Sequence, residues 1–197
     1  MNYLPIYIVN IYLFFAVISM AFLTAYGMMK SRSVHAKVFS ALSAGAGIYL
    51  FGYIQELNSF VRNEMAFWNL VQYFAIPFLP ALWRLMILSA VKKEFPGRGI
   101  TIGLFLIPAA TFLVRLTNRF HHLYYDSISL QWKSEMVVLH VVKGPWYYVQ
   151  SGFVLVTLLV AFVVILLQFR RSSGLEHTQY GILLIASVLP WLGNVMV

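Results

Sequence analysis

The chain has 197 residues, of which 61% are hydrophobic and only 10% are charged. Soluble domains carry about one quarter charged residues, so this composition excludes a soluble globule and predicts a membrane protein. Fourteen Lys and Arg against six Asp and Glu give a formal net charge of +8. On so apolar a chain, a basic excess favours contact with lipid headgroups over nucleic acid. The lack of cysteine excludes disulfides and thiolate metal ligands.

Six stretches are apolar and long enough to cross a bilayer core, which needs roughly 20 residues per helix. They are residues 4–28, 38–57, 67–91, 100–116, 147–169 and 178–197. The sequence therefore predicts an all-α polytopic helix bundle that forms one transmembrane domain over residues 1–197. Pro77 and Pro80 lie inside the third stretch, where proline removes backbone donors, so we expect that helix to bend.

The distribution of basic residues predicts the orientation of the bundle. The first span is followed but not preceded by positive charge, and eight basic residues fall on alternate short loops. These are Lys30, Arg32, Lys37, Lys92, Lys93, Arg98, Arg170 and Arg171. Short loops rich in Lys and Arg stay on the cytoplasmic side, whereas charges in long loops count weakly. We therefore expect an N-terminus outside the cell, with loop 117–146 also outside.

The long loop at 117–146 contains the only strand-like pattern. Residues 124–131 partly alternate between apolar and polar side chains, residues 136–142 are rich in β-branched types, and polar residues lie between them. This pattern predicts a short extracellular β-hairpin over the helix ends.

Small residues in the second span recur at four-residue spacings: Ser40 with Ala44, and Ser43 with Gly47. Such spacing lets membrane helices approach closely. It favours packing within the chain, with homodimer formation as the alternative.

Two charged side chains lie within apolar spans. Glu56 is near the outer end of the second span, and either faces a cavity or simply contacts interfacial water. Arg84 lies about 12 Å from the inner end of the third span. We expect its side chain to reach toward cytoplasmic phosphates, although it could also act as a charge that biases helix packing during signalling. Because their depths differ by about 16 Å, no direct pair between them is expected.

Aromatic and amide side chains gather in the outer half of the predicted bundle. An interfacial aromatic belt accounts for several of them, but amides at membrane depth need internal partners. We expect an outward-open pocket for a small apolar or amphipathic molecule, such as a lipid or acyl signal, among the second, third, fifth and sixth spans. Its candidate lining residues, besides Glu56, are Gln72, Tyr73, Pro77, Trp146, Tyr147, Trp191 and Asn194.

The outer loop also carries a cluster of polar residues: His121, His122, Tyr124, Tyr125 and Asp126, with His140 further on. Imidazole and carboxylate groups can bind zinc, but adjacent histidines on an extended segment point to opposite faces, so we predict no metal and no cofactor. His121 and Asp126 also match the H-x-x-x-x-D pattern of acyltransferases, in which the histidine is a general base. We favour a third interpretation, in which His121, His122 and Tyr124 cap the outer mouth of the pocket.

Four segments together resemble a known family: VQYFAIPFLPALW (71–83), LTNRFHHLYYDSISL (116–130), GPWYYV (144–149) and VLPWLGN (188–194). They are similar to the N-terminal seven-helix membrane region of bacterial sensor histidine kinases. The resemblance implies a ligand-sensing module in the bacterial plasma membrane, with an outside N-terminus and a cytoplasmic kinase or cyclase output. Only six spans and no output domain are recognised up to Val197, so we expect this sequence to be a fragment without enzymatic activity of its own.

The predicted function is thus a two-component sensor module that binds a small molecule from the outer side and passes a helix rearrangement inward. The main alternative is a small transporter or channel, which would need polar residues along the whole bundle. The third is a membrane acyltransferase using His121 and Asp126. Membrane lipids and a small amphipathic ligand are the expected partners.

Overall fold

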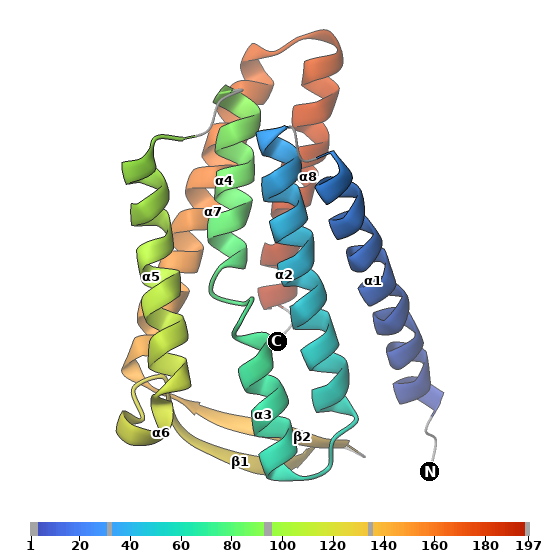
Figure 1. Cartoon of the computed structure of the whole chain (residues 1–197), viewed down its shortest axis with the longest axis vertical. Coiled ribbons are helices and arrows are strands. Elements are labelled where there is room, and N and C mark those ends of the chain that lie inside the picture. Colours follow the sequence, from blue (N-terminus) through green and yellow to red (C-terminus); the bar gives the residue numbers. More distant parts are fainter. Residues whose placement is uncertain (1–3, 31–32, 93–95, 134–135, 196–197) are drawn as a thin grey trace.

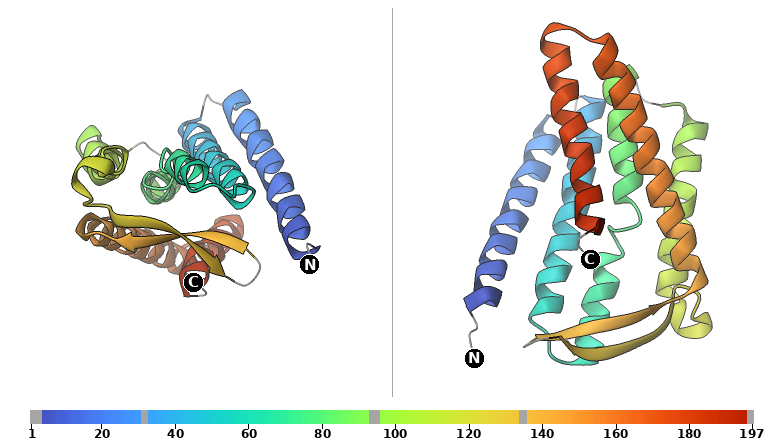
Figure 2. Two further views of the ribbon diagram at one scale, coloured as in Figure 1. Left: turned by 90° about the horizontal axis from the view of Figure 1, so that it is seen from below. Right: turned by 180° about the vertical axis from the view of Figure 1, so that it is seen from behind.

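The computed structural model describes residues 4–30, 33–92, 96–133 and 136–195, and it is mostly helical. Its elements, in chain order, are α1 (Leu4–Met29), α2 (Val34–Leu57), α3 (Arg62–Gln72), α4 (Leu79–Lys92), α5 (Arg98–Leu116), α6 (Asn118–His121), β1 (Tyr125–Lys133), β2 (Met136–Lys143), α7 (Pro145–Arg171) and α8 (Gly174–Val195). The long helices run roughly side by side, and the two strands lie across one end of the bundle (Figures 1 and 2). We call this the hairpin end. The opposite end, which carries Lys30, Arg98 and Arg170, is the basic end.

Four of the described helices are long and apolar enough to cross a membrane on their own: residues Ile6–Met29 of α1, α2, α5 and α7. α3 and α4 together cover the third span predicted from the sequence, and α8 covers most of the sixth. Four such helices make the chain a multi-pass membrane protein. Six crossings, and the side of the membrane on which each end lies, stay predictions.

The third predicted span is broken rather than bent. α3 ends at Gln72, α4 begins at Leu79, and residues 73–78 form consecutive turns between them (Figure 1). Pro77 and Pro80 have no backbone N–H, so a continuous ladder of helical hydrogen bonds is interrupted here. Turn bonds such as Ile76 N to Gln72 O (3.0 Å) and Phe78 N to Ala75 O (2.9 Å) pair the backbone N–H groups of the segment. Backbone polar groups at this depth need such internal partners.

The predicted hairpin is confirmed. β1 and β2 pair antiparallel, with Ile128 opposite Val141 and Leu130 opposite Leu139. The register shifts between Tyr125 and Ser127, so Asp126 has no partner across the ladder. A four-residue helix, α6, precedes the strands and was not expected from the sequence.

The small residues of α2 lie against α1. The Ser40 hydroxyl donates to the Thr24 carbonyl oxygen of α1 (2.9 Å), and a Cβ added to Gly27 would lie 2.9 Å from the Ser40 Cβ. A Cβ on Gly47 would lie 3.4 Å from the Met20 Cβ. The small-residue spacing therefore serves helix packing within the chain, as we favoured.

The apolar core is divided along the bundle. Near the basic end, Ile87 of α4 packs with Ala161 and Ile165 of α7 and with Tyr180 of α8. Near the hairpin end, the core is aromatic instead and contains Tyr73, Tyr124 and Tyr125. The second cluster lies beside the candidate site.

Candidate functional site

The Glu56 carboxylate near the end of α2 is bonded to two amides of α3. One of its oxygens accepts hydrogen bonds from Gln72 Nε2 and from Asn69 Nδ2, the latter at 3.3 Å. Asn69 and Gln72 are three residues apart, so a helix presents them on one face. One turn before Glu56, a Cβ on Gly52 would lie 2.7 Å from Gln72 Cγ. The glycine therefore permits the close approach of α2 and α3 that brings these groups together.

Arg115, in the last turn of α5, extends this network. Its Nη2 donates to Asn69 Oδ1 at 3.0 Å. Its guanidinium carbon lies 5.1 Å from the ring centroid of Tyr73 and 4.9 Å from that of Tyr125, within the range of cation–π attraction. The side chain is 6% exposed, and among the described residues its Nε has no hydrogen-bond partner. A buried cation with a free donor is costly, and such groups are expected to face a partner of opposite charge or polarity.

Three tyrosines join the network to the hairpin. The hydroxyl oxygens of Tyr73 and Tyr125 are 2.6 Å apart, and the rings of Tyr73 and Tyr124 meet edge to face with centroids 5.1 Å apart. Burial raises the pKa of the Tyr124 and Tyr125 phenols above the ordinary value, and for Tyr125 the Tyr73 hydroxyl and the Arg115 charge offset only part of this effect. Both phenols therefore stay neutral at physiological pH.

Asn118 fixes the start of the hairpin. Its Oδ1 accepts from the backbone N–H groups of Tyr124 (2.8 Å) and Tyr125 (3.2 Å), and its Nδ2 donates to the Tyr125 carbonyl oxygen (2.8 Å). His122 adopts a left-handed conformation (φ 55°) and ends α6. At the return of the hairpin, a Cβ on Gly144 would lie 2.3 Å from the Leu123 carbonyl oxygen. These contacts hold Tyr124 and Tyr125 in place.

A second polar chain joins α5 to α7. Trp146 Nε1 donates to Thr111 Oγ1 (3.1 Å), and the Thr111 hydroxyl donates to Gln150 Oε1 (2.9 Å). Next to Trp146, the Tyr147 ring lies 5.8 Å from that of Tyr124. The two aromatic residues that open α7 thus contact α5 and the tyrosine cluster.

A cavity of about 420 Å³ adjoins Arg115 between α3, α5, α6 and β1. Its lining residues are Arg62, Leu70, Arg115, Leu116, Asn118, Arg119, His122, Tyr125, Asp126, Ser127 and Ile128. Three arginines against one aspartate give it a positive charge. The sequence predicts a pocket among the second, third, fifth and sixth spans, and that pocket stays a prediction because the side chains of its sixth-span residues lie outside the described residues. Tyr73, Tyr124 and Tyr147, three of its predicted lining residues, belong to one aromatic cluster.

The structure gathers several predicted site residues and separates others. Glu56, Gln72, Tyr73 and Tyr124 belong to connected contacts, whereas Pro77 is buried at the break between α3 and α4. The side chains of Trp191 and Asn194 lie outside the described residues, so their predicted roles stay predictions. Arg84 is half-buried, and within the described chain its buried Nε has no hydrogen-bond partner.

The histidines of the outer loop lie in the turn after α5 and in the hairpin. His121 Nδ1 accepts from the Leu123 N–H (3.1 Å), which leaves Nε2 as the protonated nitrogen toward Thr117 Oγ1 (3.0 Å). Both ring nitrogens therefore bond within the turn after α5, and a general-base role of His121 stays an untested alternative. His140 is exposed and lies opposite Ser129 in the hairpin. In the described ranges, no group of three or more His, Cys, Asp or Glu is placed to hold a metal ion.

Sequence reasoning missed Asn69, Arg115 and Asn118 as members of the site. Arg115 lies one residue before the end of the fourth predicted span, where a basic side chain ordinarily reaches interfacial water, so the sequence pattern offers no reason to include it. Asn69 could have been found from its spacing to Gln72, since two amides at i and i+3 in an apolar span share one face. Asn118 bonds only to the backbone, and its role depends on the fold of the hairpin.

A family model described as the N-terminal 7TM region of histidine kinase matches residues 12–197. The searches of curated proteins and of solved structures found no match. The family match confirms the resemblance inferred from the four sequence segments. The matched region is a sensor domain and not the catalytic part of such a kinase, and no kinase output domain lies in this chain. Since the match covers far more than half of its length, the chain belongs to the family of N-terminal seven-transmembrane regions of histidine kinases.

Proposed function

We propose that this sensor region recognises a small amphipathic molecule in the cavity beside Arg115 and passes a helix rearrangement to the basic end. The observation that carries the proposal is Arg115 itself: it is buried, it lines the cavity, and among the described residues its Nε lacks a hydrogen-bond partner. A polar ligand group that accepts this hydrogen bond would remove the cost of the unpaired donor.

The lining indicates the chemistry of the ligand. Arg62, Arg115 and Arg119 favour a carboxylate or another anionic head, while Leu70, Leu116 and Ile128 offer apolar surface to a short hydrocarbon part. A volume of about 420 Å³ is within the range of ordinary small-molecule sites. The proposed ligand is therefore an amphipathic anion of modest size.

The proposed location is the bacterial plasma membrane, with the N-terminus and the hairpin outside the cell. This orientation is supported by the short basic segments of the sequence between α1 and α2, between α4 and α5 and between α7 and α8. The described helix ends that flank these segments lie at the end opposite the hairpin (Figure 1). A ligand from outside would then reach the Arg115 cavity without crossing the bilayer.

The hydrogen bonds suggest how binding is relayed. Asn69 contacts both Arg115 and Glu56, so a ligand that draws the guanidinium toward the cavity changes the contacts between α5, α3 and α2. Tyr73 follows α3 and begins the non-helical segment 73–78. Such a relay requires the ligand to bind one packing arrangement more tightly than the other, and its effect cannot exceed that difference in affinity.

Ligand-dependent stability tests the proposal. The purified chain in lipid nanodiscs is titrated with octanoate and, as an uncharged comparison, with octanol, while thermal unfolding is followed. Octanoate is expected to raise the unfolding temperature, since a ligand at 100 times its Kd adds about 2.7 kcal/mol. Octanol is expected to have a much smaller effect.

Three variants locate the effect. Arg115→Gln and the cavity-filling Ser127→Trp should each remove the response to octanoate, and the second leaves the Arg115 network intact. Arg98→Gln, at the basic end, removes the same charge far from the cavity and should keep the full response. Equal responses in all variants, or no response in the wild type, would exclude an anion site at this cavity.

A further inference from the structure

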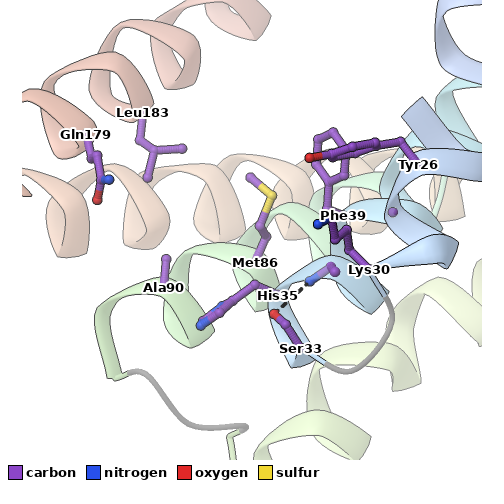
Figure 3. Close-up of a pocket in the computed structure, with 11 residues that line it drawn as sticks. Tyr26, Lys30, Ser33, His35, Phe39, Met86, Ala90, Gln179 and Leu183 are labelled. Atoms are coloured by element: carbon purple, nitrogen blue, oxygen red, sulfur yellow. Dashed lines mark hydrogen bonds between the residues drawn. The ribbon is translucent and has the colours of Figure 1, made fainter. Parts of the chain in front are cut away.

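The basic end contains a second, larger cavity, of about 740 Å³, between α1, α2, α4 and α8. Figure 3 shows side chains from α1 and α2 on one side of it and from α8 on the other. The lining residues are Tyr26, Gly27, Lys30, Ser33, His35, Ala36, Phe39, Met86, Ala90, Gln179 and Leu183. The cavity is remote from the Arg115 site, at the opposite end of the bundle, and the proposed sensing function does not use it.

The polar part of the lining is suited to an anion. Lys30 supplies a positive charge, and no Asp or Glu is among the described residues that line the cavity. Ser89 donates its hydroxyl proton to the Met86 carbonyl oxygen (2.8 Å), so at 3.1 Å it accepts from His35 Nδ1. In the neutral imidazole this bond leaves His35 Nε2 as an acceptor, which suits a hydroxyl group and not an anion. Ser33, which caps α2, and the amide of Gln179 add hydrogen-bonding groups at the rim.

The remaining lining is apolar and suits a hydrocarbon chain. Tyr26, Phe39, Met86 and Leu183 line the cavity below its polar rim. Among the described helices α1 packs against α2 and α8 packs against α7, while no extensive packing joins α1 to α8 (Figures 1 and 2). The gap between α1 and α8 is therefore occupied by this cavity instead of by direct helix contact.

We propose that this cavity binds one anionic phospholipid from the adjacent leaflet, with the headgroup phosphate held by Lys30 and by the hydroxyl of Ser33. An acyl chain lies along the apolar lining between α1 and α8. The phosphate-bearing lipid is favoured over a soluble phosphate because the polar groups lie at one rim of a lining that is otherwise apolar. The lipid joins α1 to the α4, α7 and α8 core, which α1 otherwise reaches mainly through α2.

Native mass spectrometry of the full chain, released from nanodiscs, tests the proposal. Nanodiscs of phosphatidylcholine that contain a minor fraction of phosphatidylglycerol are compared with nanodiscs of phosphatidylcholine alone. We expect the wild type to retain phosphatidylglycerol in preference to phosphatidylcholine. Lys30→Gln should lower this retention roughly fivefold, which corresponds to about 1 kcal/mol for one basic residue near an anionic surface.

Two further variants distinguish binding in this cavity from nonspecific attraction between anionic lipids and basic side chains. Lys37→Gln removes an exposed charge close in sequence to His35 but outside the cavity lining, and should retain the lipid as the wild type does. Ala90→Leu fills part of the cavity without changing the charge, and this variant should no longer retain the lipid. If Lys37→Gln and Lys30→Gln lose the lipid equally, or if Ala90→Leu retains it, the cavity is not the lipid site. Displacement of the bound lipid by millimolar inorganic phosphate would show a soluble-anion site instead and overturn the lipid assignment.

Discussion

The hydroxyl oxygens of Tyr73 and Tyr125 lie 2.6 Å apart, although 52 residues separate them in the chain. Tyr73 caps the C-terminus of α3, and Tyr125 is the first residue of β1. Arg115 lies over both rings. This contact joins the hairpin to α3, the helix that carries the Asn69 and Gln72 amides. We therefore expect a displacement of one element to displace the other.

Tyr125→Phe should destabilise the protein by about 1–2 kcal/mol, because it removes one hydrogen bond and leaves the buried Tyr73 hydroxyl with fewer partners. The double variant Tyr73→Phe with Tyr125→Phe should cost less than the sum of the two single changes. Unfolding by denaturant in mixed micelles measures each free energy. Tyr148→Phe, at an exposed position on α7, is the control and should be near neutral. Strictly additive costs would mean that the two hydroxyls do not interact.

Arg115→Met should lower the free energy of unfolding by about 2–4 kcal/mol. It removes a hydrogen bond from a charged donor, worth about 1.5–3 kcal/mol, and cation–π contacts worth about 0.5–2 kcal/mol. Arg119→Met makes the same change four residues later, where the arginine is exposed and lies over the exposed Phe120 ring, and should cost less than about 1 kcal/mol. Similar losses for both variants would contradict a buried network around Arg115.

Alkaline titration should reveal the buried phenols. Because the pKa values of Tyr124 and Tyr125 are raised in the folded protein, the unfolded chain releases these protons first as the pH rises above about 10. Their contribution to stability is therefore fully present below pH 10 and declines as the pH rises toward the folded-state pKa values. The tyrosinate absorbance of the wild type minus that of Tyr125→Phe measures this directly. A difference signal with its midpoint at the ordinary tyrosine pKa would show that Tyr125 is exposed to water.

Gly52→Ala should destabilise the contact between α2 and α3, since the new Cβ would lie 2.7 Å from Gln72 Cγ and 3.2 Å from the Trp68 carbonyl oxygen. Gly152→Ala is the matched control on α7, because a Cβ there meets nothing within 4 Å and alanine favours helix by up to about 1 kcal/mol. Thermal unfolding should thus move in opposite directions for the two variants. A neutral Gly52→Ala would mean that Gln72 is free to move away from Glu56.

The lengths of the apolar stretches and the types of residue at the turns made much of the fold predictable. The ends of α1, α2 and α5 lie within a few residues of the predicted spans, and the hairpin follows the alternation in residues 124–131. The break between α3 and α4 was expected only as a bend. Two prolines predict where a helix is disturbed. Whether it bends or opens into turns depends on which groups form hydrogen bonds with the freed backbone, and the sequence pattern does not contain that information.

The site was less predictable. Glu56 and Gln72 were singled out because a polar side chain in an apolar span needs a partner, and the structure pairs them with each other, while their ligand-binding role stays a prediction. Arg115 was missed because a basic residue at the end of a span ordinarily reaches water, whereas here the hairpin folds back over it. The cavity likewise depends on the hairpin folding back over the helix ends, which brings residues of β1 against α3 and α5.

The break at residues 73–78 gives the two halves of one span partly different neighbours. Both halves pack against α2, but α3 also contacts the hairpin, whereas α4 shares its apolar core with α7 and α8. The two halves are joined by the turn bonds of residues 73–78 and not by a continuous helical ladder, so we expect the angle between them to change more readily than within an unbroken helix. We expect such a segment to act as a joint within the span, so that a displacement at one end reaches the other as a change of angle instead of a sliding of the whole helix.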